Sequence, residues 1–218
     1  ACGKKWTEWM TIEQLEEMLK VLSKWKHHFQ IHLTGGEPFM NFPLLLSATE
    51  IVKTKGIFQF VETNASWCTS ENRANDWLKK LSDAGLNGIL ISCSAFQAES
   101  IPLRRVLIAI KSANRIFGSS NVAIYQAHCI DEISKFSVDE PVPIKSYLER
   151  YGDRITGQMF WNIYGLIDSG RASYTLGYLT QKYPPERFKR YNCAMELLYA
   201  HHSHMDLYGN YISWFCGG

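Results

Sequence analysis

A glycine pair followed by an acidic residue and a proline is the sharpest chemical signal in the sequence. The segment runs from Thr34 through Gly35, Gly36 and Glu37 to Pro38. Two glycines remove every side chain beyond hydrogen, so bare main chain can touch a ligand and adopt positive φ. The residue before a proline is held extended, which presents main-chain carbonyls that suit an ammonium group. A plain tight turn between a strand and a helix is the alternative interpretation.

A second group of metal-ligating residue types lies near the C-terminal end of the sequence. His202, His204 and Asp206 alternate, so a strand over 202–208 would turn all three side chains to one face. Two imidazoles and a carboxylate suit Fe(II) or zinc. A polar strand face or a lid is the alternative. His32, inside a short apolar run, is interpreted as a core histidine.

Six cysteines are spread along the chain without a C-x-x-C pair. This spacing argues against a zinc ribbon, a thioredoxin-type site and a disulfide-stapled secreted scaffold. Each cysteine is interpreted first as a small buried apolar residue of a cytoplasmic protein in a reducing compartment. The cysteines lie at positions 2, 68, 93, 129, 193 and 216.

The composition is that of an ordinary globular protein. Of the 218 residues, 46% are hydrophobic and 20% are charged, which supplies ample material for a core. The net charge of +2 is too small to indicate nucleic acid or an acidic membrane as a partner. No apolar run reaches the roughly 18 residues of a membrane span. Residues 1–10 also lack the apolar segment of a secretory signal.

Short apolar runs alternate with amphipathic stretches along most of the chain. A capping-box pattern from Thr11 to Gln14 predicts the start of a helix that continues through Leu22. Further helices are predicted over 43–53, 70–84, 102–116 and 143–151. Strands are predicted over 30–34, 57–62, 88–92, 121–126 and 158–164.

Strand–helix repeats of about 30 residues predict βαβ units and a parallel sheet in an α/β fold. A doubly wound open sheet and a full or partial β/α barrel both fit this pattern. In either architecture a working site lies at the carboxyl ends of the strands. The expected site positions therefore directly follow Thr34, Glu62, Ser92, Gln126 and Tyr164.

The glycine segment and several later ones, taken in order, resemble the radical S-adenosylmethionine (radical SAM) superfamily. Its Gly-Gly-Glu-Pro motif matches residues 35–38 one for one. Thr63 and Asn64 follow the next strand, where the family often has Thr-Asn-Gly. Asp-Ser-Gly-Arg-Ala at 168–172 resembles a segment that follows the sixth strand in many members. The likeness extends over roughly residues 10–175.

The resemblance implies a partial (β/α)6 TIM-like barrel that binds S-adenosylmethionine at its mouth. The main chain of Gly35, Gly36 and Glu37 would hold the methionyl amino group. A serine would face the cofactor, and Arg104, beside Arg105, would meet its carboxylate. Gln126, at a strand end, is expected to meet the adenosine. The full set of expected cofactor-binding residues is Thr34, Gly35, Gly36, Glu37, Pro38, Asn64, Ser92, Ser94, Arg104 and Gln126.

The family's cluster motif, Cys-x3-Cys-x2-Cys, is absent from the sequence, and so is the first strand of the barrel. The three thiolates of that motif hold a 4Fe–4S cluster and leave one iron open. Cys2 is a candidate for the last cluster ligand, and a bystander cysteine is the alternative. The start at Ala1 and the end at Gly218 lead us to expect a fragment cut at both ends.

The C-terminal part resembles the opening of a SPASM-type extension, in which cysteines bind auxiliary iron–sulfur clusters. Its pattern is Cys193, then Asp-x-x-Gly-Asn over 206–210, then Cys216. We therefore expect an incomplete barrel core over 1–175 and the start of an extension over 176–218. Cys193 and Cys216 are the candidate auxiliary ligands.

Three functions are compatible with the sequence. The resemblance implies an enzyme that reductively cleaves S-adenosylmethionine and abstracts hydrogen from an unknown substrate, with a peptide or protein as the expected class. A flavodoxin or ferredoxin is the expected electron donor. The alternative is a non-catalytic barrel that has lost its cluster and holds a nucleoside-like ligand or a partner. The third is an unrelated metal-dependent barrel enzyme that uses His202, His204 and Asp206.

Overall fold

The computed structural model describes residues 8–26, 28–163, 171–190, 194 and 202–213. The chain forms two compact units. The larger unit is residues 25–165, and the smaller unit joins residues 1–24 to residues 166–218. The predicted boundary between 175 and 176 stays a prediction.

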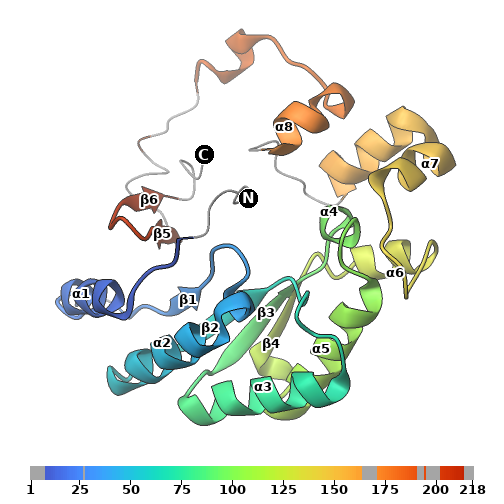
Figure 1. The fold of residues 1–218 in the computed structure, drawn as a ribbon. Helices are drawn as coiled ribbons and strands as arrows, with labels where there is room; N and C mark the ends of the chain where they lie inside the picture. Colours follow the sequence, from blue (N-terminus) through green and yellow to red (C-terminus); the bar gives the residue numbers. More distant parts are fainter. Residues whose placement is uncertain (1–7, 27, 164–170, 191–193, 195–201, 214–218) are drawn as a thin grey trace. The chain divides into compact units, whose positions relative to one another are not determined.

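The larger unit is built on a four-stranded parallel sheet in the order β1-β2-β3-β4 (Figure 1). Its strands are β1 (Ile31–Leu33), β2 (Gln59–Thr63), β3 (Gly88–Ser92) and β4 (Val122–Tyr125). In the described part of the chain this sheet is open, because β1 and β4 form its edges. The fold is therefore α/β, as predicted, and fits part of a TIM-like barrel.

Helices connect the consecutive strands, and α2, α3 and α5 lie along one side of the sheet (Figure 1). In chain order the connecting helices are α2 (Phe42–Thr54), α3 (Glu71–Ala84), α4 (Ala95–Ala98) and α5 (Leu103–Phe117). Val61 and Ile89 are register partners in adjacent strands, and with Ile91 they are at most 1% exposed. The core of the unit lies where these strand residues meet the helices.

Local sequence signals set the helix boundaries. Thr11 and Gln14 form the predicted capping box at the start of α1 (Ile12–Leu22). Ser70 caps α3, and Gly85 ends it with a φ of 109°, in the region that favours glycine. The predicted helices over 43–53, 70–84 and 102–116 are confirmed with small shifts of their ends.

The predicted fifth strand over 158–164 is wrong for the residues that the structure describes. α7 (Ile144–Gln158) instead continues into a π-helical turn, Met159–Ile163. Phe160 is fully buried there, with its ring centroid 5.4 Å from that of Tyr147. The apolar run is short, and a helical turn buries its side chains as well as a strand would. Packing therefore decides the structure where periodicity cannot.

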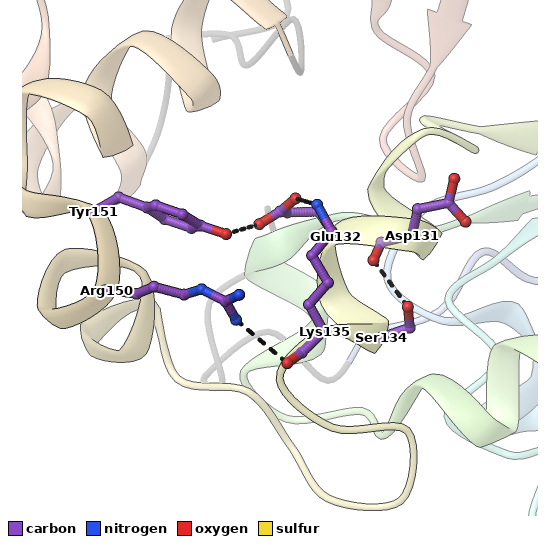
Figure 2. Close-up of polar contacts among 6 residues, drawn as sticks. All are labelled: Asp131, Glu132, Ser134, Lys135, Arg150 and Tyr151. Atoms are coloured by element: carbon purple, nitrogen blue, oxygen red, sulfur yellow. Dashed lines mark hydrogen bonds and ion pairs between the residues drawn. The ribbon is translucent and has the colours of Figure 1, made fainter.

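A polar network joins α7 to α6 (Cys129–Ser134), a helix that the sequence patterns do not predict (Figure 2). The Glu132 carboxylate accepts hydrogen bonds from the Tyr151 hydroxyl and, at 2.6 Å, from Lys135 Nζ. Arg150 donates to the main-chain carbonyl of Lys135 at 3.3 Å. Glu132 is only 8% exposed, so these donors compensate the cost of burying its charge. The network holds α7 against α6.

The smaller unit contains α1, α8 (Arg171–Thr175) and an antiparallel hairpin of β5 (Ser203–Met205) and β6 (Tyr211–Ser213). The strand predicted over 202–208 is therefore shorter than expected. Across both units, no helix in the described ranges is both long and apolar enough to cross a membrane. Short 3₁₀ turns complete the described structure at Pro38–Asn41, Ser119–Asn121, Gly177–Leu179 and Pro185–Phe188.

Gly88→Ala tests how closely β3 approaches the start of β4. A Cβ at Gly88 would lie 2.6 Å from the main-chain carbonyl oxygen of Asn121. Because backbone yields less readily than a side chain, we expect the free energy of unfolding to fall by about 1–3 kcal/mol. Urea denaturation measures this change. Gly36→Ala is the control, because its Cβ meets nothing within 4 Å among the described residues. Equal stability of the two variants would contradict the prediction.

Candidate functional site

The glycine bend follows β1 at the carboxyl edge of the sheet. Thr34, Gly35 and Gly36 are exposed, whereas Glu37, Pro38 and the residue after them are buried. Gly35 has a φ of 133°, which side-chain-bearing residues rarely adopt. A Cβ placed on either glycine would meet nothing within 4 Å among the described residues. The main chain of the bend is therefore bare and open.

Glu37 anchors this bend to the end of β2. Its Oε1 accepts from the Thr63 hydroxyl at 2.8 Å, and its Oε2 accepts from the N–H of Asn64 at 2.8 Å. Oε1 also accepts from the N–H of Phe39 at 3.2 Å. Glu37 is 5% exposed, and burial raises its pKa, while the three hydrogen bonds oppose that rise. The sequence assigned only the main chain of Glu37 to the site, yet its side chain sets the position of the bend.

Thr63 connects Glu37 to an aromatic stack formed by Phe39, Trp67 and Trp77. The Thr63 oxygen accepts from the indole N–H of Trp67 at 2.9 Å. The rings of Trp67 and Phe39 lie nearly parallel, with centroids 4.1 Å apart and an interplanar angle of 6°. Trp77 extends the stack at 5.4 Å from Trp67. The buried end of the bend therefore rests on a layered apolar support.

A second carboxylate, Glu62, lies at the same edge with its side chain 33% exposed. Its Oε1 accepts from the Ser92 hydroxyl at 2.8 Å, and its Oε2 accepts from the Thr34 hydroxyl at 3.2 Å. His32 Nε2 lies 3.3 Å from the same Oε2. The hydrogen bond from His32 lowers the pKa of Glu62, and those from Ser92 and Thr34 act in the same direction, against burial. An ionised, accessible carboxylate here favours a cationic ligand.

Glu62 and His32 are not among the residues predicted for the site. The sequence pattern predicts Glu62 at the end of a strand and His32 in the core. Strand register brings them together, since β1 pairs His32 with Phe60, two residues before Glu62 on the same face of β2. The sequence held one signal for this pair. An acidic residue ends one apolar strand, and a histidine lies inside the neighbouring strand.

The structure gathers three of the predicted site residues around the two carboxylates. Thr34 and Ser92 both donate to Glu62. The main-chain N–H of Asn64 donates to Glu37, and its side chain accepts from Ser66. These residues come from the ends of β1, β2 and β3, as the rule for parallel strands predicts.

The predicted arginine has a different partner. Arg104 forms an ion pair with Asp139, and its side chain is 63% exposed. Its neighbour Arg105 instead donates to the main-chain carbonyl of Ser66, in the turn after β2. Assignment of Arg104 to a cofactor carboxylate stays a prediction, and Arg105 is the arginine that contacts the loop of Asn64.

Two further predicted residues, Ser94 and Gln126, follow β3 and β4. Ser94 caps the short helix α4 by accepting from the N–H of Gln97 at 3.3 Å. Gln126 has a φ of 60°, so the chain turns sharply after β4. Neither geometry tests a contact with a cofactor, and both assignments stay predictions.

The described cysteines do not suit a metal centre. Cys68, Cys93 and Cys129 are free and buried, and burial raises their pKa values to about 12, 11 and 12. Among the residues that the structure describes, no group of three His, Cys, Asp or Glu side chains could hold a metal ion. The positions outside the described residues include Cys2, Tyr164, segment 168–170, Cys193 and Cys216.

The predicted metal triad of His202, His204 and Asp206 is wrong, because these described residues form no metal-holding group. The two imidazole rings do lie near each other, with centroids 4.7 Å apart. The Asp206 carboxylate, however, accepts hydrogen bonds from the N–H groups of Tyr208 and Asn210 and from the Asn210 side-chain amide, at 2.8 to 2.9 Å. Asp206 therefore builds a turn.

A comparison with protein families matches residues 3–118 to the model described as Radical SAM superfamily. The match covers more than half of the chain. The chain belongs to the radical SAM superfamily. A search of curated proteins found no match.

The bend fits the cofactor of radical SAM chemistry. Its glycines leave open the space that a Cβ would fill. Beside it, the turn after β2 holds Ala65 at a φ of 61°, where the family pattern Thr-Asn-Gly has glycine. The described part of this radical SAM chain therefore leaves the main chain open at the family's Gly-Gly-Glu-Pro motif. It does not supply ligands for an iron–sulfur cluster.

Glu37→Gln tests the anchor of the bend. The new amide would turn an N–H₂ group toward one of the three donors that the carboxylate now accepts from, leaving a buried hydrogen bond unmade. We expect the free energy of unfolding to fall by about 1–3 kcal/mol, measured by urea denaturation at neutral pH. Glu50→Gln, at an exposed position of α2, is the matched control. A loss no larger than in the control would rule the anchor out.

Glu62→Gln tests the second carboxylate through pH. Because folding lowers the pKa of Glu62 from its ordinary 4.5, the ionised form stabilises the fold above that pH, and the gain is lost as pH falls through the lowered value. The stability difference between the parent and Glu62→Gln should therefore shrink on acidification below 4.5. Denaturation series at several pH values measure it, with exposed Glu140→Gln as control. A constant difference would refute the assignment.

Proposed function

We propose that this protein is a radical SAM enzyme that binds S-adenosylmethionine at the glycine bend and acts on a peptide or protein. The observation that carries the proposal is the open main chain of Gly35 and Gly36, held in place by the buried Glu37 carboxylate. Radical SAM membership supplies the reaction class.

The residues at the sheet edge would bind and orient the cofactor. The carbonyls of the bend would accept hydrogen bonds from its ammonium group, because no side chain at Gly35 or Gly36 blocks them. Glu62, held ionised, would favour the positive charges of the ammonium and sulfonium groups. Thr34 and Ser92 fix this carboxylate through their hydroxyls and would thereby keep its charge at one place.

S-adenosylmethionine, once bound and reduced, supplies the family's deoxyadenosyl radical for hydrogen abstraction. The described cysteines are unsuited to an iron–sulfur cluster, so no step is assigned to one here. We propose Cys2 as a 4Fe–4S cluster ligand and Cys193 and Cys216 as auxiliary ligands. A flavodoxin or ferredoxin is the proposed electron donor, and the cytoplasm the proposed location.

The peptide substrate rests on the C-terminal pattern. Cys193, the Asp-x-x-Gly-Asn segment over 206–210 and Cys216 are similar to the start of a SPASM-type extension. Such extensions often accompany peptide or protein modification. The turn built by Asp206 supports a structural role for that segment.

A non-catalytic barrel that binds a nucleoside-like ligand is the second candidate. The same open bend supports it, because binding needs the bare main chain and no electron. Anaerobic reconstitution of the full-length gene product with iron and sulfide separates the two functions. Formation of 5′-deoxyadenosine with dithionite supports the enzyme, whereas S-adenosylmethionine binding without that product supports the binding module.

Gly36→Ala tests the cofactor site. The added methyl group meets no described residue within 4 Å, so the fold should keep its stability while the space for the ligand shrinks. We expect S-adenosylmethionine to bind about tenfold more weakly or worse, a loss of roughly 1.4 kcal/mol, by isothermal titration calorimetry. Ser119→Ala, an exposed substitution before β4, is the control. Unchanged affinity in Gly36→Ala would reject the bend as the binding site.

A further inference from the structure

The C-terminal hairpin carries a turn whose main chain is tied to a single carboxylate. The turn spans Asp206–Asn210, between β5 and β6. Asp206 Oδ1 accepts from the N–H groups of Tyr208 and Asn210 at 2.9 and 2.8 Å, and Oδ2 accepts from the Asn210 amide at 2.9 Å. Gly209 has a φ of 82°, which glycine adopts without strain. The turn therefore has a fixed shape.

This hairpin turn contacts the N-terminal part of the same compact unit at two points. Gln14 Nε2 donates to the main-chain carbonyl of Leu207 at 2.7 Å. The Tyr208 hydroxyl donates to Glu8 Oε2 at 2.6 Å. The two residues of the first contact are 193 positions apart in the sequence, and those of the second are 200 positions apart. Gln14 lies in the first turn of α1, and Glu8 lies in the segment that leads into it.

Gln14 has two tasks at this contact. Its Oε1 accepts from the N–H of Thr11 at 2.7 Å, while its own N–H donates to the Thr11 hydroxyl at 3.2 Å, completing the capping box of α1. Its Nε2 is then left to reach the Leu207 carbonyl. One amide thus fixes the first turn of the helix and the hairpin turn together.

We propose that the hairpin turn is a clamp on the start of α1, with Gln14 and Tyr208 as its positioning residues. The ordered hairpin turn then also keeps residues 8–14 ordered. Those residues lie inside the 3–118 range that matches the radical SAM superfamily. The hairpin itself lies between Cys193 and Cys216. The clamp therefore couples the C-terminal segment to the N-terminal end of the matched domain, and its relevance to catalysis rests on the proposed function.

Gln14→Glu isolates the clamp from the helix cap. Glutamate serves the capping box as well as glutamine does, but it has no N–H to donate to the Leu207 carbonyl. We expect residues 15–22 of α1 to keep their protection in hydrogen–deuterium exchange, while peptides covering the hairpin turn exchange about three- to tenfold faster. Unchanged exchange of the turn would overturn the proposal, as would equal loosening of residues 15–22 and the turn.

Tyr208→Phe and Glu8→Gln test the second contact as a double-mutant cycle on the full chain. The clamp predicts that Tyr208→Phe raises exchange of residues 8–14 and that the combined variant shows less than the sum of the single effects. Tyr211→Phe, at an exposed tyrosine of the same hairpin, is the matched control. Additive effects, or an equal response in the control, would refute the clamp.

These exchange measurements need no cofactor, so they are independent of the proposed function. A parent protein that forms no 5′-deoxyadenosine on reconstitution would reject the proposed function and leave the clamp intact. A variant that matches the parent in exchange would reject the clamp.

Discussion

The hydrogen bonds of the Glu37 carboxylate are the constraint on which the candidate site depends. A charged group with 5% exposure is costly unless donors surround it, and Thr63, Asn64 and Phe39 supply those donors. The donors come from two segments, the 3₁₀ turn after the glycines and the end of β2. These hydrogen bonds therefore fix the distance between the 3₁₀ turn and the end of β2. The exposed glycines before that turn need no contacts of their own.

Two carboxylates at one sheet edge have opposite environments and opposite roles. Burial raises the pKa of Glu37, which serves inside the protein, whereas the hydrogen bond from His32 lowers the pKa of Glu62, which stays accessible. Glu62 also raises the pKa of Glu37 through like charge. Because the two pKa values are shifted in opposite directions, Glu62 would face a ligand as an anion, while Glu37 holds the backbone that would contact that ligand.

The sequence predicts what local chemistry determines. The capping box at Thr11, the helix end at Gly85 and the bend at Gly35 and Gly36 are each encoded within a few residues, and each is found. The contact of His32 with Glu62 depends on register between strands that are 28 positions apart, which no local pattern contains. Phe160 adopts a helical turn because tertiary packing overrides a short apolar run. Asp206 is committed to its own turn, a use that residue type alone does not reveal.

The aromatic stack gives the site an optical consequence. Trp67 is 7% exposed, and its indole N–H is bonded to Thr63, the residue that also donates to Glu37. Its fluorescence therefore originates in an apolar layer that is two hydrogen bonds, through Thr63, from the Glu37 carboxylate that anchors the bend. A ligand that shifts this anchor would change the wavelength or yield of that emission, so the protein contains an intrinsic reporter beside the cofactor pocket we propose.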